Sequence, residues 1–295
     1  MNKTTGYLRL IRPANIVTSI ADVLAGIALS GFFIGLFDPN NIWLVLLICI
    51  STVGLYGGGV AFNDIFDAKL DQIERPERPI PSGIISLKQA IIFSSIFLLF
   101  GILAAFLVNP LSGLLAISIS IAALIYNKWA KHQLILGPLN MGLCRGLNLL
   151  LGISILPLSI FDLWYVALVP VIYISAVTLI SRGEVHGLSR KPLYLAALLY
   201  TAVIALIFYF AFVKDKQWMV LFFLMPFAGM IFKPLLTATK NPTGSNIGKA
   251  VKAGVISLIL MDAAWAAASG EFVAAIVIVF LLPISFWLAK LFAVT

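Results

Sequence analysis

The stretch "IWLVLLICISTVGLYGGGVAFNDIFDAKLDQIERPERPIPSG", residues 42–83, joins a long apolar run directly to a dense group of charges. Its first half is long enough to span a membrane, because about 20 helical residues cross a hydrocarbon core. Its second half, from residue 63, holds five of the twelve acidic side chains of the protein and three prolines. A segment this polar, placed at the end of a span, indicates a function other than packing a core.

The composition of the whole chain predicts an integral membrane protein. Of its 295 residues, 61% are hydrophobic and 11% are charged, whereas a soluble domain carries about 25% charged residues. The apolar runs do not alternate as barrel strands do, so the backbone must satisfy its hydrogen bonds within helices. The predicted fold class is therefore all-α. The two cysteines lie within apolar runs without metal-ligand spacing and are interpreted as small buried side chains.

The apolar runs predict a polytopic bundle of nine to ten helices. Ten candidate spans are marked, and the count falls to nine if the short fourth and eighth runs do not cross. They are 16–36, 42–62, 90–108, 111–126, 134–158, 163–180, 193–213, 218–232, 251–268 and 272–292.

The loops between these spans predict the orientation of the protein. The amino terminus and loops 63–89, 127–133, 181–192 and 233–250 carry fifteen Lys and Arg residues, whereas the opposite loops carry only Lys214 and Lys216. Loops rich in Lys and Arg stay in the cytoplasm. We therefore expect both termini in the cytoplasm and a bacterial inner membrane as the location. The same asymmetry explains most of the net charge of +8, so no nucleic-acid partner is expected.

Three aspartates after residue 62 are the strongest candidates for chemistry. Asp64, Asp67 and Asp71 are spaced i, i+3 and i+7, so they line one face if the second helix continues past Phe62. Carboxylates on one face repel one another unless a counter-charge is present. Mg²⁺ favours hard oxygen ligands and bridges carboxylates to substrate phosphates. The alternative interpretation is a solvated helix end.

Two arginines follow the acidic face, interleaved with prolines that end the helix and stiffen the loop. Arg75 and Arg78 are placed to bind diphosphate oxygens that a metal leaves free. An equal alternative is that the two arginines anchor the loop on the cytoplasmic side or pair with Glu74 and Glu77.

The segment "NDIFDAKLD" fits the NDxxDxxxD pattern of the UbiA superfamily of intramembrane prenyltransferases, and "RPERPIPSG" resembles the segment that follows it there. Three further segments resemble parts of that family. They are "LRLIRPANIVTS" with Asn15, "IYNKWAKH" with Tyr126 and Lys131, and "NMGLCRGLNLLLG" with Asn140 and Arg145. The resemblance covers about residues 8–190. The later "SRGEVHG" also resembles the branch found in Ebo-type natural-product clusters.

This resemblance implies a single UbiA-like transmembrane domain over residues 1–295, with helices around a central cavity open to the cytoplasm. It implies that the aspartates and Asn63 hold Mg²⁺ on the diphosphate of a polyprenyl donor. The diphosphate then leaves, and an acceptor captures the prenyl group. Arg75, Arg78, Lys131 and Arg145 are candidates for binding the diphosphate, and the lipid bilayer holds the donor's tail. The oligomeric state is left open.

The sequence departs from the family where a second aspartate-rich motif is expected. There it reads "SRGEVHGLSRKP", and Glu184 is its one acidic residue. Glu184 is aligned with that motif, as a ligand of a second Mg²⁺ or a catalytic group, with His186 as an unusual helper. Alternatively, Arg182, Arg190 and Lys191 replace the charge of the second metal, or the acidic residue and the histidine are only a loop pair.

Several polar residues lie within predicted spans, where they usually face the interior of a bundle. Asn15, Ser19 and Asp22 share one helix face and are read as a cavity wall or as interhelical hydrogen bonds. Arg145 requires an acidic or phosphate partner, so it binds substrate or pairs with Asp22 or another acid. Asp262 is interpreted as part of a structural pair.

The sequence therefore predicts a Mg²⁺-dependent prenyltransferase that acts on an aromatic or other small acceptor. The alternative is a non-enzymatic carrier of a lipid or aromatic metabolite that keeps the fold. The reduced second motif and the tenth span favour that alternative. A purely structural membrane protein does not explain three acids on one face.

Overall fold

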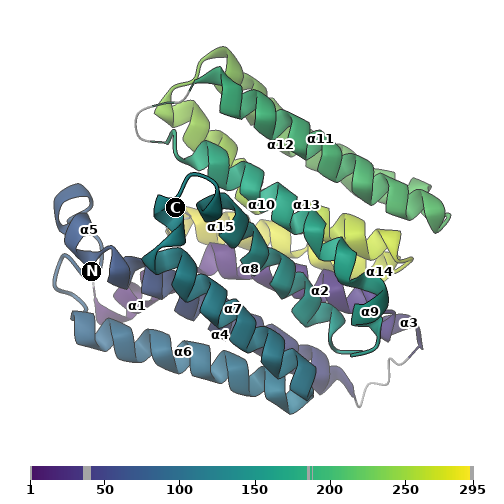
Figure 1. The fold of residues 1–295 in the computed structure, drawn as a ribbon, viewed down its shortest axis with the longest axis horizontal. Coiled ribbons are helices and arrows are strands. Elements are labelled where there is room, and N and C mark those ends of the chain that lie inside the picture. Colours follow the sequence, from purple (N-terminus) through teal and green to yellow (C-terminus); the bar gives the residue numbers. More distant parts are fainter. Residues whose placement is uncertain (1, 36–40, 185–186, 188, 293–295) are drawn as a thin grey trace.

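The computed structural model describes residues 2–35, 41–184, 187 and 189–292, and every regular element within them is helical (Figure 1). The prediction of an all-α fold is thus confirmed. The elements of the first half are α1 (Lys3–Ile11), α2 (Pro13–Leu29), α3 (Phe32–Gly35), α4 (Ile42–Phe66), α5 (Ala68–Glu74), α6 (Leu87–Val108), α7 (Pro110–Lys128), η2 (Ala130–His132) and α8 (Leu136–Ile153). Those of the second half are α9 (Ser159–Leu163), η3 (Trp164–Ala167), α10 (Leu168–Ser181), α11 (Arg190–Val213), α12 (Gln217–Lys240), α13 (Gly244–Ala268), α14 (Phe272–Val279) and α15 (Leu281–Leu291).

The protein is an integral, multi-pass membrane protein. In the described part of the chain, eight helical segments are long and apolar enough to cross a membrane, or up to nine if the bent pair α1 and α2 is one span. Helix α8 is not among them, although it packs against α2, α7 and α10. The sequence predicted a longer span here, 134–158. The helix instead ends at Ile153 and carries polar side chains inward, so it is shorter and less apolar than a lipid-facing span.

The two runs predicted to be short spans are full-length helices. Helix α7 begins at Pro110, where proline is suited to the first turn, and continues to Lys128. Helix α12 continues to Lys240, with Pro226 and Pro234 in its interior. Proline is tolerated inside membrane helices because neighbouring groups satisfy the freed carbonyls.

Glycines allow close backbone contacts at two helix pairs. A Cβ atom on Gly58 of α4 would lie 2.9 Å from the carbonyl oxygen of Ser94 in α6. Gly58 therefore permits a close approach of α4 to α6. Between α2 and α8, a Cβ on Gly26 would meet the backbone of Leu149, and a Cβ on Gly152 would meet the backbone of Val23. Small residues at such contacts are typical of membrane interfaces.

A bend of 41° separates α1 from α2. Arg12 ends the first helix and precedes Pro13, with a left-handed φ of 49°. A residue other than glycine in this region carries backbone strain of about 1–3 kcal/mol. The bend turns the start of α2 into the bundle, which brings the side chain of Arg12 toward the carboxyl end of α4.

Different short helices lie at the two ends of the bundle. Figure 1 places α5 and the amino terminus at one end and α3 and α9 at the opposite end. Asp64, at the end of α4, therefore lies beside the amino-terminal segment, where Arg12 contacts it. Helices α2, α8, α10 and α13 form the middle of the molecule, where α13 is the most buried of the candidate spans.

Candidate active site

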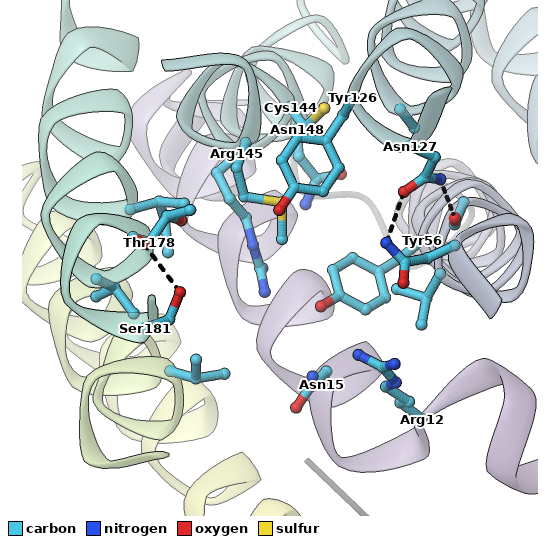
Figure 2. A pocket seen from close by; sticks show the side chains of 18 of the residues that line it. Arg12, Asn15, Tyr56, Tyr126, Asn127, Cys144, Arg145, Asn148, Thr178 and Ser181 are labelled. Carbon is cyan, nitrogen blue, oxygen red and sulfur yellow. Dashed lines mark hydrogen bonds between the residues drawn. The ribbon is translucent and has the colours of Figure 1, made fainter. Parts of the chain in front are cut away.

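A cavity of about 400 Å³ opens between the central helices near the α5 end. Helices α2, α4, α7, α8, α10 and α13 contribute to its walls, and Arg75 and Arg78 from the segment after α5 also line it. Figure 2 shows Tyr56 and Tyr126 facing this space, with Arg145 on one side and Arg12 and Asn15 on another. The polar lining groups come from segments far apart in the sequence, so the fold gathers them into one site.

The three aspartates do not share one uninterrupted helix face. Helix α4 includes Asp64 in its last turn, Asp67 is the residue at the break, and Asp71 belongs to α5. Helix α5 ends at Glu74, two residues before Pro76, as the prolines predicted. The break separates the roles of the carboxylates, because Asp64 and Asp71 are buried while Asp67 is partly exposed.

Asp64 and Asp71 converge on a single guanidinium. Nη1 of Arg78 donates to Oδ1 of Asp64 at 3.1 Å and to Oδ2 of Asp71 at 2.7 Å. Nη2 of Arg12 donates to the same oxygen of Asp64 at 3.1 Å. Buried carboxylates require such partners, because an unpaired charge away from water is strongly unfavourable. The acidic motif is therefore neutralised by two arginines that are 66 positions apart in the sequence.

Neighbouring contacts fix the rest of the motif. Lys131, in η2, donates to Oδ1 of Asp67 at 2.5 Å. Nδ2 of Asn63 donates to Oδ1 of Asn127 at 3.0 Å, and Nδ2 of Asn127 donates to the carbonyl oxygen of Gly59 at 2.8 Å (Figure 2). These bonds tie the end of α4 to the end of α7, so Asn63 holds a defined position in the cavity wall.

Glu184 also lines the cavity, at the segment that follows α10. Its Oε1 atom is buried, and no hydrogen-bond partner is recorded for it among the described residues. Burial raises the pKa of Glu184, and the nearby cations Arg75 and Arg12 lower it in part. The electrostatic neighbours of Glu184 are thus arginines rather than aspartates. His186 lies outside the described residues.

Among the described residues, no three His, Cys, Asp or Glu side chains come together as a ready set of metal ligands. The role of Glu184 as a ligand of a second Mg²⁺ stays a prediction, and its charged neighbours here are Arg75 and Arg12. Asp64 and Asp71 nevertheless fit a magnesium ion. Their oxygens approach one positively charged nitrogen, and carboxylate oxygens are the donors that this ion favours.

The inner wall of the cavity is built around Arg145. Its Nη1 donates to Oδ2 of Asp22 at 2.7 Å, and its Nη2 donates to the hydroxyl of Thr18 at 2.7 Å. The guanidinium lies 4.9 Å from the ring centroid of Tyr56. Arg145 thus pairs with Asp22, which was one of the two alternatives offered by the sequence, and it also lines the cavity. Its role in substrate binding stays a prediction.

Asn148 and Asp262 complete this buried group. Nδ2 of Asn148 donates to Oδ2 of Asp22 at 2.9 Å, and its Oδ1 accepts from the hydroxyl of Thr52 at 2.7 Å. Asp262, in α13, is buried close to both Asp22 and Arg145. Four helices thus meet at one polar cluster inside the bundle.

Six of the predicted site residues are not part of the cavity lining, namely Asp64, Asp67, Asp71, Lys131, Asn140 and Arg182. Arg182 is exposed and donates to the backbone carbonyl of Gln133. Asn140 accepts a weak bond from the thiol of Cys144 and is not part of the cavity lining. The predicted residues that do line it are Asn15, Asn63, Arg75, Arg78, Tyr126, Arg145 and Glu184.

Arg12, Tyr56 and Asn148 also line the cavity, although none of them was predicted as a site residue. Each had a signal in the pattern. Arg12 precedes Asn15 by three residues, Tyr56 precedes Asn63 by seven, and Asn148 follows Arg145 by three. Such spacings place each missed residue on the face of a residue that was identified.

Comparison with known proteins gives a consistent picture. The model of the UbiA prenyltransferase family matches residues 24–251. A protein named digeranylgeranylglyceryl phosphate synthase from Methanosarcina barkeri is 40% identical over 39% of this chain and 39% of that protein. The protein of the same name from Methanococcoides burtonii is 33% identical over 50% of this chain and 53% of that protein. The chain therefore spans about half the length of these curated relatives, or less.

Solved structures share the fold over most of the chain. One, described as giving insights into digeranylgeranylglyceryl phosphate synthase in membranes, has a TM-score of 0.66 and 24% identity, covering 91% of this chain and 99% of that one. A UbiA homolog from Archaeoglobus fulgidus, solved with DMAPP and Mg²⁺, has a TM-score of 0.62 and 15% identity, covering 86% and 98%. At these identities the likeness establishes the fold.

Proposed function

Because this chain belongs to the UbiA prenyltransferase family, we propose that it transfers a prenyl group from a polyprenyl diphosphate to an aromatic or other small acceptor within the membrane. The proposal treats residues 1–295 as one domain of this kind. The proposal rests on one observation. Asp64 and Asp71 are buried and contact the same nitrogen of Arg78, beside a cavity lined by Arg12, Arg75 and Arg78. Opposite charges in this arrangement suit a metal and a diphosphate together.

The residues take distinct roles in this proposal. Asp64 and Asp71, with Asp67 beside them, would hold Mg²⁺, which supplies positive charge to the departing diphosphate. Arg12, Arg75 and Arg78 would bind the diphosphate oxygens, since guanidinium groups pair with phosphate in a forked geometry. The prenyl carbon–oxygen bond breaks with its electron pair leaving on the diphosphate. The acceptor then forms a bond to the prenyl carbon and loses a proton.

Tyrosine rings line the space where an allylic cation would develop. Tyr126 and Tyr56 both face the cavity (Figure 2), and an aromatic face attracts a nearby cation. The complex of the Archaeoglobus fulgidus homolog with DMAPP and Mg²⁺ supports the choice of ligands. The names of the curated relatives support an isoprenoid substrate.

The activity is tested by incubating the purified protein with geranylgeranyl diphosphate and Mg²⁺ and measuring diphosphate release with and without candidate acceptors. We expect release that stops when EDTA removes the metal and returns when Mg²⁺ is added back. If no prenyl diphosphate of any length releases diphosphate, but reconstituted vesicles transport a lipid or aromatic compound, the carrier alternative replaces this proposal.

The orientation is proposed from the loop charges, with the cavity mouth and both termini in the cytoplasm of a bacterial inner membrane. Single cysteines placed at Glu77 and at Asp162, in a background without Cys49 and Cys144, provide the test. We expect an impermeant thiol reagent added outside intact cells to label position 162 and not position 77. The reverse labelling would contradict the proposed orientation.

A further inference from the structure

The wall of the cavity presents arginines rather than aspartates. Arg12, Arg75 and Arg78 are lining residues, whereas Asp64, Asp67 and Asp71 are not among them. The exposed fraction of the Arg78 side chain is 13%, against 6% for Asp64 and 4% for Asp71. A bare metal ion that approaches from the cavity therefore meets guanidinium groups before it meets its carboxylate ligands.

Arg78 occupies the position where a cation is required. One of its nitrogens lies within hydrogen-bond distance of both Asp64 and Asp71. A bound metal and this nitrogen therefore compete for the same two oxygens. Since these ion pairs are largely shielded from water, their attraction is screened much less than that of surface pairs. Removing Arg78 without a substitute charge would leave Asp71 without its ion pair and Asp64 with Arg12 alone.

We propose that Arg78 is an exchangeable counter-ion, which neutralises Asp64 and Asp71 until a metal ion arrives together with a diphosphate. The diphosphate gives the displaced guanidinium a new anionic partner, so the loss of the two aspartate contacts is offset. A metal ion alone provides no such partner. The ligand class rests on the proposed function, whereas the exchange itself rests on the contacts of Arg78.

The local backbone is suited to this exchange. The N–H of Arg78 donates to the carbonyl oxygen of Arg75 at 3.1 Å, and the N–H of Ser82 donates to the carbonyl oxygen of Arg78 at 3.0 Å. The turn is therefore held by main-chain bonds that do not involve the guanidinium. The long side chain exchanges partners by rotating about its own bonds, while the turn stays in place.

The consequence is cooperative binding of metal and diphosphate. Thermodynamic linkage requires that each ligand strengthens the binding of the other by the same factor. The test measures Mn²⁺ binding to the purified protein by electron paramagnetic resonance, with and without methylenediphosphonate as a stable diphosphate. For the unmodified protein we expect Mn²⁺ alone to bind weakly, and the diphosphonate to tighten its binding at least about tenfold.

Arg78→Gln removes the competing cation. We expect this variant to bind Mn²⁺ alone about tenfold more tightly than the unmodified protein does, and to lose most of the gain from the diphosphonate. Arg75→Gln is the matched control, because Arg75 lines the same cavity but forms no recorded ion pair with these aspartates. It removes the same charge, so its effect on Mn²⁺ binding without the diphosphonate reports the general electrostatic effect.

Thermal unfolding provides a second measurement. Arg78→Gln should unfold at a lower temperature than the unmodified protein in EDTA and recover most of the difference in Mn²⁺, because the metal then neutralises both carboxylates. A purely structural ion pair would not be replaced by the metal in this way.

The outcomes separate the two proposals. If the unmodified protein binds Mn²⁺ with the diphosphonate, but Arg78→Gln tightens Mn²⁺ no more than Arg75→Gln does, the exchange is wrong and the proposed function stands. If the unmodified protein binds neither Mn²⁺ nor the diphosphonate, the proposed function fails. If Arg78→Gln does not fold, the exchange is tested on the unmodified protein alone. Equal Mn²⁺ affinity with and without the diphosphonate would then show that the exchange is wrong.

Discussion

Replacing Asp64 by Asn is expected to lower prenyl transfer by about 10³-fold, because loss of metal charge at the leaving group costs several kcal/mol and each 1.4 kcal/mol is about tenfold in rate. Asparagine has the same shape but no negative charge, so it holds a metal poorly. Asp64 accepts bonds from both Arg12 and Arg78, and no other aspartate in the motif joins two arginines in this way among the described residues. The measurement is diphosphate release from geranylgeranyl diphosphate under saturating Mg²⁺.

Glu74→Gln is the matched control for this experiment. Glu74 lies three residues after Asp71 in the same segment, but its side chain is exposed and forms no recorded ion pair. We expect this variant to keep activity within about twofold, as an exposed charge contributes little. Membrane insertion of both variants is checked by expression level and gel filtration. Activity of Asp64→Asn close to that of the unmodified protein would remove the aspartates from the proposed chemistry.

The second large effect is expected at Arg145, where Arg145→Leu should lower the free energy of unfolding by about 3–5 kcal/mol. The substitution leaves Asp22 buried with the amide of Asn148 as its recorded donor. A carboxylate that stays buried without its cation strongly destabilises the folded protein. Tryptophan fluorescence during thermal unfolding in detergent measures the effect.

The double variant Arg145→Leu with Asp22→Asn tests the cause. Removing both charges should restore a large part of the lost stability, since replacing a whole buried pair is often close to neutral. Arg190→Leu serves as a control, because Arg190 is exposed at the start of α11 and should change stability little. If Arg145→Leu unfolds at the temperature of the unmodified protein, the pair with Asp22 is not important for stability.

Much of the fold followed from hydropathy alone. Long apolar runs can only be helices in lipid, and the loop charges divided the ends of the bundle into two sets. The residues at which the spans begin and end were harder to predict from hydropathy. Helix α12 continues through two prolines, and α8 is shortened and polar. Both depend on packing between neighbouring helices, which a hydropathy pattern does not contain.

The site was predictable to the extent that it depends on local spacing. The acidic motif and the arginines after it were found because they lie close together in sequence. The contact of Arg12 with Asp64 was missed because it depends on the bend between α1 and α2. Likewise, the sequence did not predict that Arg182 is exposed. A loop arginine has the same sequence signal whether its side chain faces a cavity or the solvent.

The glycine contact between α2 and α8 limits the movements available to the bundle. In alternating access, two groups of helices rock against each other around a central binding site. Rocking α2 away from α8 would open the seam at which Gly26 and Gly152 allow the two backbones to approach, and it would pull Asp22 from Arg145 inside the bundle. These two helices therefore act as a single fixed block, which suits a reaction chamber that keeps its geometry better than a pump that must change it.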